Sequence, residues 1–184
     1  FPVDEKTIVA LGTRSGIVKR VLPDFPQKAD FSCINLKDGD RVIGVAASVD
    51  RDELVFITQD AQLLRFDASS VRAQGVNGAG MAGIKTDSGV VYFGVIKPKE
   101  KNVVLTVANS SASLPGTDGG GMKVTKLAEF PKKGRATGGV RCQKFIRGQD
   151  QIVLGYVGPE GFQLVDSKGK AIGVEYELQK RDAS

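Results

Sequence analysis

The fold is decided by the stretch Ile8-Val9-Ala10-Leu11-Gly12-Thr13-Arg14-Ser15-Gly16-Ile17-Val18-Lys19-Arg20, whose pattern returns 46 positions later in residues 54–66. Both segments consist of an apolar run, a polar turn, an apolar pair and a basic residue. This order is typical of two β-strands joined by a tight turn. A third copy opens at Val103 and a fourth at Gly161. The chain is therefore built from repeated β-hairpins.

A second element recurs between these hairpins, in residues 34–45, 84–95 and 144–155, and each copy has the pattern of strand, tight turn, strand. No window of twelve residues sustains a helical apolar face, so the segment after Phe66 is expected to form at most one helical turn. The repeated unit of about 46–60 residues with about four strands has the size of a propeller blade.

Blades of this kind must stack, because an isolated blade leaves the apolar faces of its sheet exposed. We predict an all-β, β-propeller-like chain of about four four-stranded blades within one domain spanning residues 1–184. The expected blades cover approximately residues 5–50, 51–98, 99–158 and, in part, 159–184. So few blades predict either a small or open ring, or an array whose flanking blades are missing.

The composition excludes several kinds of chemistry. The 184 residues include 26 Lys and Arg against 21 Asp and Glu, a net charge of +5, with no His and two Cys. The absence of histidine rules out a Ser-His-Asp triad, a Cys-His pair and a histidine-ligated zinc site. Cys33 and Cys142 are too few for a four-thiolate site and are interpreted as small buried strand residues. We expect no catalytic residue, no metal site and no cofactor.

The ends and the apolar runs predict where the protein resides. The chain begins with Phe1 and lacks a basic-then-apolar signal pattern, so we expect a fragment cut from a longer chain. The longest apolar runs, such as residues 42–47, are far shorter than the ~20 residues of a membrane helix. A soluble, cytoplasmic protein without membrane contact is expected.

Glycine accounts for 23 of the 184 residues, about one in eight, whereas its ordinary usage is about 7%. They concentrate at the same point of successive units, in residues 72–85 and 132–141, beside Arg and Lys. Two interpretations stay open: sharp turns between strands, or loops whose bare amide N–H groups and cations hold phosphate. Neither a Walker pattern nor a strand-GxGxxG-helix unit is present, which argues against a nucleotide pocket.

Other candidate sites have simpler interpretations. Residues 37–40 and 50–53 lack the spacing of a calcium loop and are interpreted as turns. Five phenylalanines lie among basic residues, and core packing is expected for them because a duplex does not expose base faces. They are Phe25, Phe31, Phe66, Phe130 and Phe145.

The order of the motifs resembles the blades of the C-terminal domain found in the A subunits of type IIA DNA topoisomerases, gyrase and topoisomerase IV. Residues 13–20 match the first half of the family's blade, residues 123–140 match the middle, and the Asp-Gly-Asp turn at 38–40 matches the end. The resemblance covers about residues 5–175. It implies a β-pinwheel, a propeller-like ring whose neighbouring blades exchange strands, here as a partial or shortened copy.

The resemblance also implies a function. The rim of the pinwheel would bind duplex DNA without strong sequence preference, bend or wrap it, and present it to the cleavage core. The domain itself would be a non-catalytic accessory part of an ATP-dependent topoisomerase. Its partners would be duplex DNA, the remainder of the A subunit and, through it, the ATPase subunit, in a nucleoid-associated cytoplasmic location. The isolated domain would be a monomer.

The chain departs from the family pattern at two places. Gyrase carries a Gln-x-x-Gly-Gly-Lys-Gly box that is absent here, and residues 117–123 share only its glycines. Residues 25–33 replace the glycine loop in the first unit, so its rim is expected to bind DNA less well. The family's cleavage tyrosine is also expected to be absent, with Tyr92, Tyr156 and Tyr176 interpreted as strand or tail residues.

Cations at matched blade positions are the expected contacts, because neutralised phosphates release condensed counterions. The sequence alignment pairs Lys19 with Arg65, and residues 131–147 hold six basic residues and no acid. About 6–8 neutralised phosphates would give log K against log[salt] a slope near −5 to −7. The expected contacts are Arg14, Lys19, Arg20, Arg65, Arg72, Lys123, Lys126, Lys132, Lys133, Arg135 and Arg141.

Two alternatives compete with DNA binding. The first is a propeller used for protein–protein contact, with incidental basic charge. The second is an enzyme or sugar-binding propeller, against which the absence of histidine and of clustered carboxylates argues.

Overall fold

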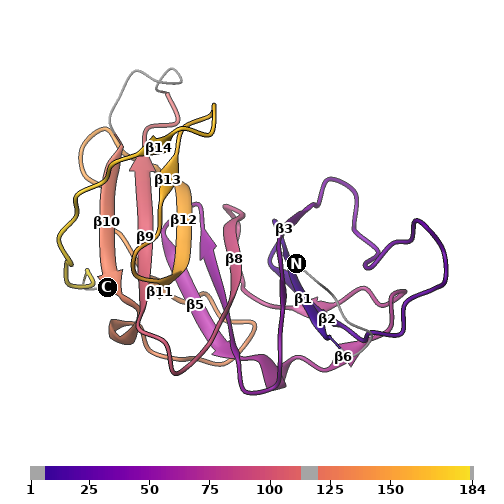
Figure 1. Cartoon of the computed structure of the whole chain (residues 1–184). Coiled ribbons are helices and arrows are strands. Elements are labelled where there is room, and N and C mark those ends of the chain that lie inside the picture. The colour runs from indigo at the N-terminus through magenta and orange to yellow at the C-terminus, as the bar shows by residue number, and fades with distance from the viewer. Residues whose placement is uncertain (1–6, 113–119, 183–184) are drawn as a thin grey trace.

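The computed structural model describes residues 7–112 and 120–182, which form three β-sheets and a hairpin standing side by side (Figure 1). The first sheet contains β1 (Val9–Thr13), β2 (Ile17–Val21), β3 (Val42–Ala47), β6 (Ala73–Gln74) and β7 (Met81–Ala82). The second contains β4 (Glu53–Thr58), β5 (Gln62–Asp67), β8 (Val90–Ile96) and β11 (Val140–Arg141). The third contains β9 (Asn102–Asn109), β10 (Gly121–Lys126) and β12 (Gln151–Pro159), and the hairpin contains β13 (Leu164–Val165) and β14 (Ala171–Ile172).

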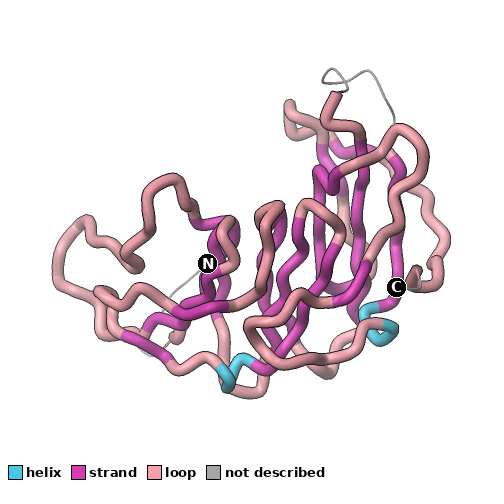
Figure 2. Tube along the Cα trace, turned by 180° about the vertical axis from the view of Figure 1, so that it is seen from behind, coloured by secondary structure: helices cyan, strands magenta, loops and turns pink. Residues whose placement is uncertain are grey.

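Helical structure in the described ranges is confined to two 3-10 turns, η1 (Ala68–Ser70) and η2 (Leu127–Glu129), both on the lower edge of the molecule (Figure 2). The turn η1 follows Phe66 at the place where at most one helical turn was expected. Neither turn has the length or the apolar character that a bilayer-spanning helix needs. The all-β prediction is confirmed.

Each sheet is completed by a segment of the following unit. In the first sheet β2 pairs with β6 and β7, which come from the second unit. In the second sheet β5 pairs with β11, from the third unit. In the third sheet Val124 of β10 pairs with Leu178, beyond the last hairpin. This is the exchange of strands that the pinwheel resemblance implied.

The register of the first two hairpins corrects the sequence alignment by one residue. Gly12 pairs with Val18 in the first hairpin and Ile57 pairs with Leu63 in the second, so equivalent positions lie 45 residues apart rather than 46. A shift of one residue moves a strand's side chains to the other face. Lys19 therefore corresponds to Leu64, and it is Arg20 that corresponds to Arg65.

The second recurring element is only half a hairpin. Its later limbs form β3, β8 and β12, but the earlier limbs at 34–37, 84–87 and 144–147 form no strand. The backbone of the second earlier limb is used elsewhere, because Ile84 donates to the carbonyl of Gly16 and Lys85 to that of Thr137. The prediction of a strand in these limbs was wrong.

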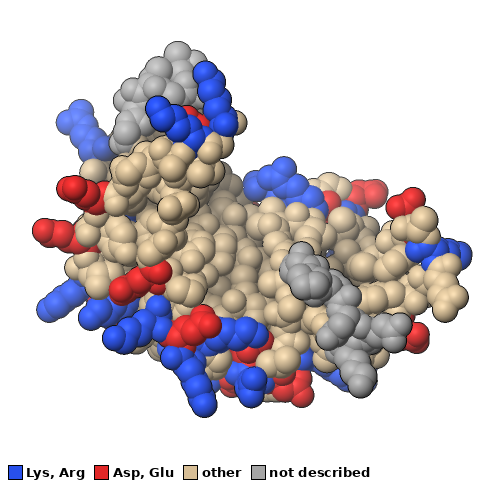
Figure 3. Space-filling view, viewed as in Figure 1, with Lys and Arg blue, Asp and Glu red and all other residues tan. Residues whose placement is uncertain are grey.

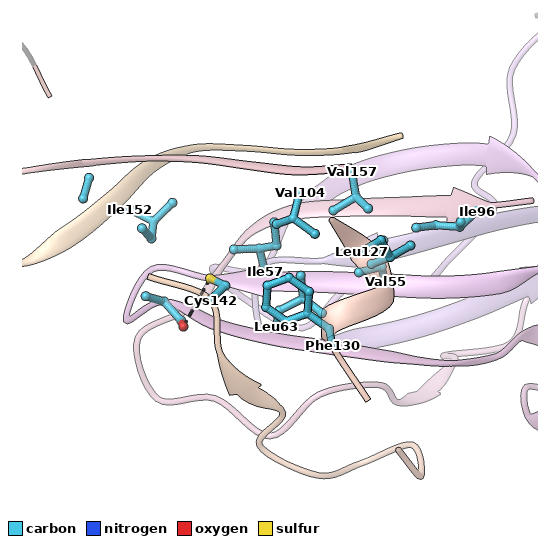
Figure 4. Close-up of a cluster of buried hydrophobic side chains, with 12 residues drawn as sticks. Val55, Ile57, Leu63, Ile96, Val104, Leu127, Phe130, Cys142, Ile152 and Val157 are labelled. Carbon is cyan, nitrogen blue, oxygen red and sulfur yellow. Dashed lines mark hydrogen bonds between the residues drawn. The ribbon is translucent and has the colours of Figure 1, made fainter. Parts of the chain in front are cut away.

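The core lies between the sheets. Strand β8 packs between β3 and β12, and Phe56, Phe66 and Phe93 fill the space between the first two sheets. Between the second and third sheets, Phe130 and Leu127 pack on Val55 and Leu63 (Figure 4). Complete burial of side chains of this size stabilises the fold by about 1.5–3 kcal/mol each.

The aromatic residues mostly have the expected places. Phe66 and Phe130 are buried and Phe145 packs against the core, whereas Phe31 is 39% exposed and its ring contacts that of Phe25 in a tilted arrangement in the loop after β2. Tyr92 and Tyr156 lie on β8 and β12, and Tyr176 stacks on Phe162 in the C-terminal segment. Phe31 is therefore a surface residue, because the loop that carries it leaves the sheet.

A Ser–Asp clasp closes each of the first three units. Ser15 in the first hairpin turn donates to Asp40 in the turn before β3, through both its amide and its hydroxyl. The third unit repeats this arrangement with Ser111 and Asp150. In the second unit the two residues are exchanged, and Ser88 donates to Asp60. The clasp gives Asp40 a structural role in residues 37–40, which the sequence analysis interpreted as a turn and not as a calcium loop.

Candidate nucleic-acid interface

Two glycine loops occupy equivalent places on the sheet edges opposite β3 and β8, but their backbones differ at one turn, where Ala136 has φ of +65° and its equivalent Asn77 has no positive φ. Residues 71–83, called loop two, run along β2, and residues 130–142, called loop three, run along β5. Gly80 and Gly139 occupy the same place in the two loops, with φ of +79° and +78°. A Cβ atom at Gly139 would lie 2.5 Å from the carbonyl oxygen of Leu63, so both the backbone angle and the close approach require glycine.

Lys19 lies beneath loop two rather than on the surface. Its side chain is fully buried, and Nζ donates to the carbonyls of Cys33, Val76 and Gly78 at 2.6, 2.8 and 2.7 Å. Burial lowers the pKa of Lys19, and the nearby Cys33 thiol opposes that effect. Three carbonyls use all three donors of the ammonium group. The prediction that Lys19 contacts DNA is thus replaced by a structural role.

Arg20 is buried next to Lys19 and holds the start of the same segment. Its Nη1 donates to the carbonyls of Ala68 and Val71, and its Nη2 forms an ion pair with Asp50 at 2.6 Å. With 2% of its surface exposed, Arg20 does not reach a ligand outside the molecule. Lys19 and Arg20 together form a clamp on the exchanged segment of the next unit.

Lys123 and Arg65 are also drawn inward. Lys123 is 6% exposed and pairs with Asp182 at 2.7 Å. The Arg65 side chain, 18% exposed, lies 3.3 Å from a carboxylate oxygen of Glu53. These two predicted contacts face acidic partners inside the molecule, because their strands point them away from the solvent.

Arg14 lies apart from the glycine loops, in the turn between β1 and β2. It lines a cleft of about 430 Å³ together with Asp38, Asp40 and Asp87, and its Nη2 donates to Gln59 at 3.4 Å. The acidic surroundings oppose the approach of a phosphate.

Five of the predicted cations are exposed on or beside the loops: Arg72, Lys126, Lys132, Lys133 and Arg141. Figure 3 shows blue Lys and Arg side chains along the lower edge, with red acidic side chains among them. Lys132 pairs with Asp67 at 2.7 Å, and the hydrogen bond to Asp67 raises its pKa. Within the described ranges, Arg72, Lys126, Lys133 and Arg141 make no ion pair.

Loop three carries most of this charge. It holds Lys132, Lys133, Arg135 and Arg141 and no acidic residue, whereas loop two holds Arg72 alone. Arg135 is half-buried, with its Nη1 on the carbonyl of Ala82 at 2.5 Å. Lys144 and Arg147, both exposed, continue the basic stretch, and the run of cations from 131 to 147 was the signal that could have added them to the predicted contacts.

The remaining features concern metal-binding side chains, clefts and cysteines. No group of three metal-binding side chains occurs in the described part of the chain. A cleft of about 670 Å³ between β8, β9 and η2 is lined by mixed charges, among them Glu53, Arg65 and Lys126. Burial raises the pKa of Cys142 to about 12, and its Sγ donates to the carbonyl of Ala61 (Figure 4). Cys142 is buried as expected but lies just after β11, and Cys33 is half-buried in a loop, so neither cysteine is on a strand.

Known proteins match the chain over most of its length. The chain is 34% identical over 157 residues to the DNA gyrase A subunit of Escherichia coli strain K12, covering 84% of this chain and 17% of that protein. It is 28% identical over 185 residues to the DNA gyrase A subunit of Deinococcus deserti, covering 95% of this chain and 22% of that protein. The chain thus spans about a fifth of these relatives.

Solved structures share the fold. The crystal structure of the C-terminal domain of DNA topoisomerase IV matches with a TM-score of 0.79 at 23% identity, over 96% of this chain and 55% of that one. The structure of the DNA gyrase A C-terminal domain matches with a TM-score of 0.73 at 20% identity, over 93% and 56%. The predicted β-pinwheel is confirmed by these likenesses.

The model of the family described as "DNA gyrase C-terminal domain, beta-propeller" matches residues 32–48, 52–96 and 116–153, which is more than half of the chain. The unmatched first 31 residues include most of the segment that replaces a glycine loop. Sequence, strand exchange and family match agree, and this chain belongs to the family of DNA gyrase C-terminal β-propeller domains.

Proposed function

We propose that this chain is a non-catalytic accessory domain, part of the A subunit of a type IIA topoisomerase, that binds duplex DNA along its glycine loops and bends it. The observation that carries the proposal is loop three, a loop fixed to the neighbouring sheet that presents cations and no acid to solvent. The proposed protein partners are the rest of the parent topoisomerase chain and, through it, the ATPase subunit, in a nucleoid-associated cytoplasmic location.

The proposed contacts are Arg72, Lys126, Lys132, Lys133 and Arg141. Cations bind phosphates without reading base edges, so affinity should depend strongly on salt and weakly on sequence. Five contacts give a slope of log K against log[salt] near −4 to −5, lower in magnitude than the slope expected from the sequence alone. Bending 20–30 base pairs costs about 1–6 kcal/mol, which contacts from successive blades must offset.

The test is a fluorescence-anisotropy titration with a duplex of about 30 base pairs. Reversal of Lys126, Lys133 and Arg141 to Glu should weaken binding at least about 100-fold at 0.1 M salt, since each lost contact removes nearly a decade. The matched control reverses three exposed cations elsewhere, Lys37, Lys99 and Lys168. It should change affinity by less than about threefold.

Two outcomes contradict the proposal. Absence of binding by the unaltered chain at about 100 µM and 50 mM salt excludes even ordinary non-specific affinity. An equal loss in both triple variants shows that net charge, and not loop three, determines binding. Bending is tested separately by ligating nicked circles with the domain bound, where a shift in linking number reports chiral wrapping.

A further inference from the structure

The glycine loops of the second and third units form one hydrogen-bonded surface. Ala136 donates to the carbonyl of Gly83 at 2.7 Å, and Lys85 donates to that of Thr137 at 3.0 Å. Between them, Ile84 and Thr137 form a parallel bridge. The segment after loop two and the middle of loop three therefore run side by side, as two strands of a sheet would.

Arg135 closes the end of this junction. Its Nη1 donates to the carbonyl of Ala82, one residue before the backbone bonds begin. Its Nε is enclosed and has no hydrogen-bond partner in the described structure. The side chain is thus packed into the junction, whereas Lys133 and Arg141, on the same loop, are exposed, with Lys133 Nζ donating to the carbonyl of Gly139 at 3.3 Å.

The preceding junction lacks such a residue. Val76 holds the place in loop two that Arg135 holds in loop three, because both follow the equivalent glycines Gly75 and Gly134. There the neighbouring segment is attached through the exposed side chain of Asn35, which donates to the carbonyl of Asn77. The turn there also has a different backbone, because Ala136 has φ of +65° whereas its equivalent Asn77 has no positive φ. Arg135 thus stands at the junction that is held by backbone hydrogen bonds, and the preceding junction has valine in its place.

We propose that Arg135 is a positioning residue, which fixes loop three against loop two and so sets the curvature imposed on bound DNA. The inference rests on the proposed function. A surface bends a duplex only if its contacts are held at fixed angles, because a mobile loop follows the straight duplex instead. Arg135 would act through the cations around it and would not neutralise a phosphate itself.

The test compares Arg135→Met with Lys133→Met, each of which removes one cation from loop three and keeps an unbranched side chain. In Arg135→Met the salt slope should stay unchanged, while the preference for a small DNA circle over the linear duplex falls at least about fivefold. In Lys133→Met the slope should fall in magnitude by about 0.9, with the circle preference retained. Hydrogen exchange at the amides of Ala136 and Lys85 should accelerate in Arg135→Met alone.

The conservative variant Arg135→Lys should restore the circle preference, because a lysine ammonium can also donate to the carbonyl of Ala82. A loss of about 0.9 in the slope of Arg135→Met, with unchanged exchange, makes Arg135 an ordinary phosphate contact and overturns the inference alone. If the unaltered chain does not bind DNA at all, the proposed function and this inference both fail.

Discussion

Loop two and loop three occupy equivalent places on neighbouring sheets but differ in the cations that lie beneath them. Beneath loop two lie Lys19 and Arg20, buried and bonded to its carbonyls. Beneath loop three the equivalent of Lys19 is Leu64, and the equivalent of Arg20 is Arg65, which pairs with Glu53. On the outer side of loop three, Lys133 and Arg141 are exposed.

The difference shows that a basic residue at a repeated position has two separate uses. An ammonium group below the loop satisfies carbonyls that a glycine-rich turn leaves without strand partners. An ammonium group above the loop leaves its charge to an external anion. Recurrence in the sequence does not separate the two uses, because the sequence alignment pairs Lys19 with Arg65, whereas the strand register pairs it with Leu64.

The largest expected effect is on stability, from removal of the cation of Lys19 below loop two. Lys19→Met leaves three carbonyls without their donor and should lower the free energy of unfolding by about 2–4 kcal/mol. Lys133→Met, on the outer side, should change it by less than about 0.5 kcal/mol. Urea titrations of both variants measure the difference. Equal stability of the two would remove the distinction between the loops.

A smaller loss of stability is expected from substitution of the glycine that both loops hold at positive φ. Gly139→Ala introduces a methyl group at positive φ against the carbonyl of Leu63 and should destabilise the fold by about 1–3 kcal/mol. Gly134→Ala meets nothing within 4 Å and should stay within about 0.5 kcal/mol of the unaltered chain. Thermal unfolding compares them, and a similar midpoint shift in both would mean that loop three relaxes freely.

A third substitution tests the comparison through DNA binding, by giving loop two a cation that loop three has. Ala82, exposed, occupies in loop two the position of Arg141 in loop three, since the two pair with Ile17 and Gln62 at equivalent places. Ala82→Arg should strengthen duplex binding about five- to tenfold at 0.1 M salt and make the salt slope steeper by about 0.9. Anisotropy at several salt concentrations measures both. The variant Ala82→Gln serves as the uncharged control and should change neither quantity.

The smallest effect concerns the Ser–Asp clasps of the first three units. Partial burial raises the pKa of Asp40 and Asp60, but hydrogen bonds from Ser15 and Ser88 outweigh it, so the net pKa lies below the ordinary value. In Asp150 the hydrogen bond from Ser111 lowers the pKa directly. Because the folded pKa is depressed, this stability is complete above about pH 4 and is lost as the pH falls through the folded values.

Thermal midpoints measured from pH 7 to pH 3 test this dependence. A variant with all three clasp aspartates changed to Asn should lose less stability on acidification than the unaltered chain. Parallel pH profiles for the two proteins would assign the acid sensitivity to other carboxylates, among which Asp182 also has a lowered pKa.

Much of the fold could be predicted because its signals are local. The apolar runs at 8–11, 54–57 and 90–93 predicted strands, and the repeated turns predicted the order of the units. The fate of Lys19 could not be predicted in this way. Its acceptors at Val76 and Gly78 lie 57 and 59 residues along the chain, and no local pattern marks a carbonyl as a partner.

The candidate site could be predicted only in part, because the local sequence shows where cations gather but not which of them have distant partners. Exposed Lys133 and Arg141 follow from the basic run after Pro131, which contains no acid. Lys123 lies in a stretch with Lys126 but also with Asp118 and Glu129, and its partner Asp182 lies 59 residues further along the chain. Charge and spacing located the loop, and burial then decided which of its cations face solvent.

Strand exchange makes the repeat of the sequence and the repeat of the structure differ in phase. A gene segment that encodes one sequence repeat, such as residues 51–98, carries β6 and β7 of the preceding sheet and lacks the β11 that its own sheet needs. Duplication or deletion of a whole repeat keeps every sheet complete only if the neighbours accept each other's exchanged strands. Gain or loss of blades during evolution is therefore constrained by the compatibility of these edges.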